Sequence, residues 1–127
     1  MARILIVDDD TDFARAVQAL LASKGHTVSH APDGATGCRL AKAEKPDLCI
    51  LDIMMTYDSE GLDVARRLSE DPETRRIPVL CITGIRKARD LPFSLAPDAD
   101  WLPVKAVLEK PVKPDRLLKA VADALNP

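Results

Sequence analysis

Apolar residues along the chain follow two alternating patterns. Short continuous apolar runs are typical of strands buried on both faces of a parallel sheet, and apolar residues three or four positions apart are typical of helices with one buried side. The first pattern predicts strands over Arg3–Val7, His26–His30, Asp47–Leu51, Pro78–Ile82 and Val107–Glu109. The second predicts helices over Thr11–Lys24, Asp33–Glu44, Leu62–Ser69 and Pro114–Leu125. This alternation predicts an α/β fold around a doubly wound, five-stranded parallel sheet.

Length and composition indicate one domain over residues 1–127, and we expect no output domain. A chain of 127 residues lies in the commonest size range of domains, and 46% hydrophobic residues suffice for a core without disulfides or a structural metal. Cys38, Cys49 and Cys81 fall in apolar or helical stretches. They are therefore expected to be buried, reduced thiols of a protein in a reducing compartment.

The charge balance argues against several classes of partner. Lys and Arg number 18 against 20 Asp and Glu, so electrostatics gives no reason to expect nucleic acid or an anionic membrane. No stretch approaches the ~18–20 apolar residues of a membrane span, and Ile4–Val7 is too short for a signal peptide, so we expect a cytoplasmic protein. His26 and His30 are expected to be exposed strand-end residues without a metal role, because no third ligand is near.

Polar residues that could carry chemistry follow the predicted strands. In a doubly wound sheet, ligands bind outside the carboxyl ends of the strands, where the strand order reverses. The residues placed there are Asp8, Asp9, Asp10, Asp52, Thr83 and Lys110. Grouped carboxylates repel one another unless a cation neutralises them, and an oxygen-only set suits Mg²⁺. A carboxylate beside Mg²⁺ can attack a phosphoryl group, and a lysine and a hydroxyl then stabilise the phosphoryl oxygens.

Four segments in chain order, ILIVDDD, PDLCILDIMM, PVLCITG and LEKPV, resemble the signature blocks of bacterial response-regulator receiver domains. The resemblance covers nearly the whole chain. It implies a flavodoxin-like (βα)5 receiver fold and a single-domain regulator similar to the chemotaxis regulators. It also implies a two-component phosphorelay whose partner is a sensor histidine kinase or a histidine phosphotransfer protein. Such a domain is a signalling protein and not an enzyme, although it assists its own phosphorylation and dephosphorylation, and we expect a monomer or weak dimer.

The resemblance also implies roles for the acidic residues. Asp52 is the implied acceptor of the phosphoryl group. Asp9, Asp52 and the backbone carbonyl of Met54 are the implied Mg²⁺ ligands, with Asp8 acting largely through water. Read without the family, Asp8 and Asp9 could instead cap the helix that follows them, and Asp52 could be an ordinary strand-end residue.

Thr83 is implied as the switch hydroxyl that moves onto the phosphoryl group, and Lys110 as the cation that pairs with it. Beyond the acceptor loop, where Thr56 replaces a proline and Gly61 falls one position late, two features depart from the family. Val107 stands where an aromatic residue commonly couples to the switch hydroxyl, and the segment before it is longer than usual and contains several prolines. Because proline disrupts a helix interior by about 3 kcal/mol, we expect an irregular fourth-helix region over residues 85–106.

Two other functions compete with phosphoryl acceptance. A degenerate receiver would serve only as a protein-interaction module, although this chain keeps the acids, the hydroxyl and the lysine. A phosphatase of the haloacid-dehalogenase type needs Asp-x-Asp with Thr or Val four positions after the first Asp, and counted from Asp8 that position is Asp12. Incubation with acetyl phosphate and Mg²⁺ distinguishes these functions. A functional receiver becomes labelled, a degenerate receiver stays unlabelled, and a phosphatase turns over substrate.

Overall fold

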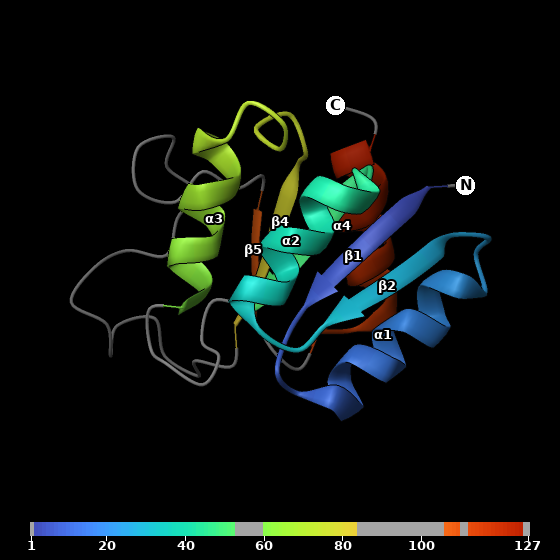
Figure 1. The fold of residues 1–127 in the computed structure, drawn as a ribbon. Helices are drawn as coiled ribbons and strands as arrows, with labels where there is room; N and C mark the ends of the chain where they lie inside the picture. The colour runs from blue at the N-terminus through green and yellow to red at the C-terminus, as the bar shows by residue number, and fades with distance from the viewer. Residues whose placement is uncertain (1, 53–59, 84–105, 110–111, 126–127) are drawn as a thin grey trace.

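A computed structural model describes residues 2–52, 60–83, 106–109 and 112–125. Its centre is a five-stranded parallel sheet in the order β2-β1-β3-β4-β5 (Figure 1). The strands are β1 (Arg3–Val7), β2 (Thr27–Ala31), β3 (Leu48–Asp52), β4 (Val79–Thr83) and β5 (Ala106–Glu109). The chain runs from β1 to one neighbour and then crosses back to the other, so the strand order reverses between β1 and β3. The predicted doubly wound parallel sheet is confirmed.

Helices cover both faces of this sheet (Figure 1). They are α1 (Thr11–Ala22), α2 (Gly34–Glu44), α3 (Glu60–Glu70) and α4 (Pro114–Leu125). Alternate residues of a strand point to opposite faces. Leu5 of β1 therefore joins one apolar cluster with residues of α2 and α3, whereas Ile4 joins a second cluster with residues of α1 and α4. Two cores, one on each face, hold the sheet.

The first helix and the second strand differ slightly from their predicted bounds. α1 ends at Ala22, two residues before the predicted Lys24. The Gly25 N–H donates to the Ala22 carbonyl (3.0 Å) and the His26 N–H to the Leu21 carbonyl (3.2 Å), with Gly25 at φ 89°. This pair of bonds with a left-handed glycine is a common helix terminator. Gly25 and His26 take part in this terminator, so β2 begins at Thr27, one residue later than predicted.

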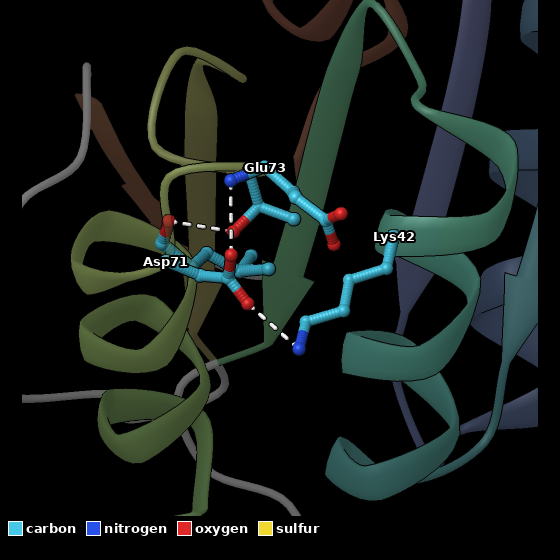
Figure 2. A network of polar contacts seen from close by, with 5 residues as sticks. Lys42, Asp71 and Glu73 are labelled. Carbon is cyan, nitrogen blue, oxygen red and sulfur yellow. Dashed lines mark hydrogen bonds and ion pairs between the residues drawn. The ribbon is translucent and has the colours of Figure 1, made fainter.

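The α3 helix is longer at both ends than the predicted Leu62–Ser69. Just after it, the Asp71 carboxylate accepts a hydrogen bond from the Glu73 N–H (2.9 Å) and pairs with the Lys42 ammonium of α2 (2.7 Å; Figure 2). This contact joins α2 to the end of α3. The predicted irregular segment lies almost wholly outside the described residues. Among the residues that the structure does describe, no helix has the length and apolar character to cross a membrane.

Candidate functional site

The pairing of β1 with β3 sets the geometry of the acidic edge. In this parallel pair Val7 lies opposite Leu51, so the next residues along the chain lie side by side: Asp8, just past the end of β1, and Asp52, the last residue of β3. Both are buried, with 2% and 4% of their surface exposed. Carboxylates are seldom buried without a partner or a cation, because removing a charge from water is costly. Two buried acids lie side by side at the switch point of the sheet, where ligands bind in folds of this kind, and so mark a candidate site.

Asp9 completes the cluster from the solvent side. Its side chain is exposed, and one carboxylate oxygen from each of Asp8, Asp9 and Asp52 lies within 4.8 Å of the others. Magnesium binds oxygen ligands at about 2.0–2.1 Å, so opposite ligands of one ion lie roughly 4 Å apart. The spacing and the oxygen-only donor set of these three residues fit a small hard cation.

The three consecutive aspartates have separate local roles. The Asp10 carboxylate accepts from the Phe13 N–H (3.0 Å) and so caps α1. The Asp10 N–H donates to Asp8 Oδ1 (2.8 Å), which fixes one oxygen of Asp8 in a tight turn. Because Asp10 supplies the cap, the alternative reading of Asp8 and Asp9 as capping residues is wrong.

The backbone of Asp8 is anchored to the edge strand β2. Its N–H donates to the Ala31 carbonyl (3.0 Å), and its own carbonyl lies 2.7 Å from Nε2 of His30. His30 and His26 are both half-buried and hydrogen-bonded, His26 through the Ala2 N–H that donates to its Nδ1 (3.1 Å). The expectation of exposed strand-end histidines is therefore wrong. No local sequence signal marks these contacts, because each spans more than twenty residues of chain.

The other predicted site residues are described in part or not at all. Thr83 is the last residue of β4 and pairs in the backbone ladder with Glu109 of β5, at the same edge of the sheet as Asp52. Its side chain lies outside the described part of the structure, as do Met54 and Lys110 entirely. Their predicted roles as switch hydroxyl, backbone ligand and phosphate-pairing cation therefore remain predictions.

Buried thiols lie beneath the acidic edge. Cys49 and Cys81 lie on the neighbouring strands β3 and β4, opposite Val79 and Leu51 respectively, and both are fully buried. Burial raises the pKa of the Cys49 thiol to about 12, and burial with the nearby charge of Asp52 raises the pKa of Cys81 well above its ordinary value. Both are neutral at physiological pH, which agrees with the predicted reduced, structural thiols, so the reactive groups of this edge are oxygens.

Comparison with known proteins agrees with this geometry. A family model described as the response regulator receiver domain matches residues 4–122. Protein PilH of Pseudomonas aeruginosa is 37% identical over 121 residues, which span 95% of each chain. The response regulator PleD of Caulobacter vibrioides is 43% identical over 84 residues, which cover 66% of this chain but 18% of PleD. A solved CheY-like receiver domain from Methanospirillum hungatei superimposes with a TM-score of 0.82 at 27% identity, over 99% of this chain and 94% of that one.

Proposed function

The chain belongs to the response regulator receiver domain family, and on that premise we propose that it accepts a phosphoryl group on Asp52. Receiver domains are signalling domains that histidine kinases or phosphotransfer proteins phosphorylate, and a partner of this class is proposed as the donor. The observation that carries the proposal is the burial of Asp52 beside Asp8, with Asp9 close by at the solvent side. A carboxylate in this setting is shielded from bulk water and held next to the acids that bind a cation.

The proposed cofactor is Mg²⁺, held by the Asp9 and Asp52 carboxylates and the Met54 carbonyl, with Asp8 acting largely through water. When bound, Mg²⁺ supplies positive charge that offsets both the carboxylates and the oxygens of the incoming phosphoryl group. The three carboxylates support this assignment because their oxygens lie within 4.8 Å of one another and no sulfur or nitrogen ligand is among them.

In the proposed transfer, a carboxylate oxygen of Asp52 attacks the phosphorus atom of the donor. A new P–O bond forms while the bond from phosphorus to the donor histidine nitrogen breaks, and the electron pair stays on that nitrogen, which takes a proton from water. The product is an acyl phosphate on Asp52. Thr83 is proposed to donate its hydroxyl hydrogen to one phosphoryl oxygen, and Lys110 to pair with another. Support for Thr83 comes from its place at the end of β4, one residue past Ile82, which lies opposite Asp52 in the sheet.

Labelling with a small phosphodonor tests the proposal. Purified protein is incubated with acetyl phosphate and Mg²⁺, and the intact mass is followed by mass spectrometry. We expect the wild type to gain one phosphoryl group that hydroxylamine removes, and Asp52→Asn to gain none, because the amide is not nucleophilic. Asp63→Asn, which changes an exposed acid on α3, is the matched control and should label like the wild type.

Two results would contradict the proposal. Full labelling of Asp52→Asn would show that another residue accepts the phosphoryl group. A wild type that stays unlabelled with Mg²⁺ present would favour the degenerate receiver, which acts only as a protein-interaction module.

A further inference from the structure

The side chain of His30 contacts the backbone of the acidic edge. His30 lies in β2, and its Nε2 is 2.7 Å from the carbonyl oxygen of Asp8, in a half-buried position. A carbonyl oxygen only accepts hydrogen bonds, so Nε2 must carry the hydrogen of this contact. The imidazole therefore donates to Asp8 whatever the state of its other nitrogen.

This bond fixes the peptide unit that leads into Asp9. The Asp8 carbonyl and the Asp9 nitrogen share one rigid plane, so holding the oxygen also orients the backbone of Asp9. The preceding peptide plane is held by the Asp8 N–H, which donates to the Ala31 carbonyl. Both peptide planes around Asp8 are thus tied to β2. The Asp9 side chain extends from this peptide, so the orientation of the peptide bears on the position of the Asp9 carboxylate.

The two strands are paired through their backbones independently of this bond. β1 and β2 are already paired in register from Arg3–Thr27 to Val7–Ala31. His30 itself is opposite Ile6 in that ladder, but the oxygen that its side chain contacts belongs to Asp8, where β1 has ended and the turn toward α1 begins. Because the accepting oxygen lies in the acidic turn, the bond bears on the shape of that turn.

We propose that His30 is a positioning residue for the cation site, holding the Asp8–Asp9 peptide so that the two carboxylates keep their spacing. The inference rests on the proposed function, because it assumes that the acidic cluster binds Mg²⁺. Residues that orient metal ligands without touching the metal commonly change its affinity by about 10–100-fold when they are replaced. His30 bonds a backbone carbonyl and not the ligand itself, so we expect the lower end of that range.

The test measures Mg²⁺ affinity of the unphosphorylated protein by titration calorimetry. His30→Leu removes the donor and should weaken binding about ten-fold. His30→Gln places an amide N–H₂ near the position of Nε2 and should restore most of the affinity. His26→Leu is the matched control, because it removes the other hydrogen-bonded histidine of this strand region at the opposite end of β2. It should leave the affinity unchanged.

Unfolding by urea in EDTA, measured on the same variants, separates stability from metal binding. If His30→Leu does not fold, His30→Asn takes its place, since the shorter amide does not reach the Asp8 carbonyl. The inference is overturned if the donor-free variant binds Mg²⁺ as tightly as the wild type, or if His26→Leu weakens binding equally. If Asp9→Ala abolishes Mg²⁺ binding while His30→Leu does not change it, the inference fails and the proposed function stands. If the wild type binds no Mg²⁺, both fail.

Discussion

Asp8, Asp9 and Asp10 show how neighbouring residues of one type acquire different properties from their surroundings. Asp8 is buried at the end of β1, Asp9 is exposed, and Asp10 caps α1. A turn that reverses direction between strand and helix points successive side chains in different directions. The Asp10 carboxylate therefore caps the helix, while Asp8 and Asp9 each place one oxygen within 4.8 Å of an oxygen of Asp52.

The three cysteines differ in burial, and this predicts that their thiols differ in reactivity. Cys49 and Cys81 are fully buried, whereas Cys38 is half-buried and lines a surface hollow of about 500 Å³ between α2 and α3. Burial raises the pKa of all three thiols, most strongly for the two in strands. At pH 8 we expect an aromatic disulfide reagent to react with Cys38 well before the others, which become accessible only when the sheet opens.

The variant Cys38→Ser is the control, since it should leave only slowly reacting thiols in the native protein. In urea all the cysteines should react at similar rates. Fast native labelling of Cys49 or Cys81 would contradict the burial of these two strand positions.

At the scale of elements, the closeness of α2 to β1 depends on one glycine. A Cβ atom added at Gly37 would lie 2.8 and 2.9 Å from the two methyl groups of Val7. Gly37→Ala should therefore lower the free energy of unfolding by about 1–3 kcal/mol, even though alanine is the better helix former by about 1 kcal/mol. Chemical denaturation measures this change.

Removing the methyl groups of Val7 tests the cause. In a Val7→Ala background, Gly37→Ala should cost much less or become stabilising, because the clash is gone and the helix preference remains. Equal costs in both backgrounds would show that the effect of the glycine does not come from Val7.

The ion pair between Lys42 and Asp71 links α2 to the turn that follows α3 (Figure 2). Hydrogen bonds from Lys42 and from the Glu73 N–H lower the pKa of Asp71, and Asp71 raises the pKa of Lys42. Because the pKa of Asp71 is lower in the folded protein than in the unfolded chain, its ion pair stabilises the fold at pH values above about 3.9. That stabilisation is lost as the pH falls through the pKa of the folded state. Because the pKa of Lys42 is higher in the folded protein, the same ion pair stabilises the fold at pH values below about 10.4. That stabilisation is lost as the pH rises through the pKa of the folded state.

Lys42→Met should therefore destabilise the protein at pH 7, and the difference from the wild type should shrink as the pH falls below about 4. Lys42 is exposed and Asp71 is only partly buried, so the effect is small and should weaken in high salt. Urea denaturation at both pH values measures it. Lys119→Met, which removes an exposed charge on α4, is the control for the general effect of losing a lysine. A difference that stays constant with pH would argue against this ion pair.

For the whole molecule, strand order predicts the pattern of stability. β3 lies between β1 and β4, and all of its residues are buried, whereas β2 is an edge strand with mostly half-exposed residues. In hydrogen exchange, we expect amides of Leu48–Leu51 to exchange only through global unfolding and those of Thr27–His30 to exchange faster. Low concentrations of urea should accelerate amide exchange in β3 much more than in β2. Equal protection of both strands would contradict this order of stability.

Much of the fold was predictable from local patterns. The short apolar runs of β1, β3 and β4 and the helical spacing in α4 marked these elements to within about two residues, which is the usual error at element ends. The misplaced end of α1 depended on hydrogen bonds that close around Gly25. The assignment of His26 and His30 as exposed failed because their partners, Ala2 and Asp8, lie just before and just after β1, far away in sequence.

The sequence by itself determined that strands and helices alternate and that acids follow β1 and end β3, because periodicity and chain direction are local properties. It therefore predicted that Asp8, Asp9 and Asp52 lie at one edge of a parallel sheet. Only the tertiary structure decided that β1 pairs directly with β3, which brings the three carboxylates within 4.8 Å. It alone placed His30 on the Asp8 carbonyl and Gly37 against Val7. These contacts join residues more than twenty positions apart, and such distances are fixed by packing and register, which no local pattern encodes.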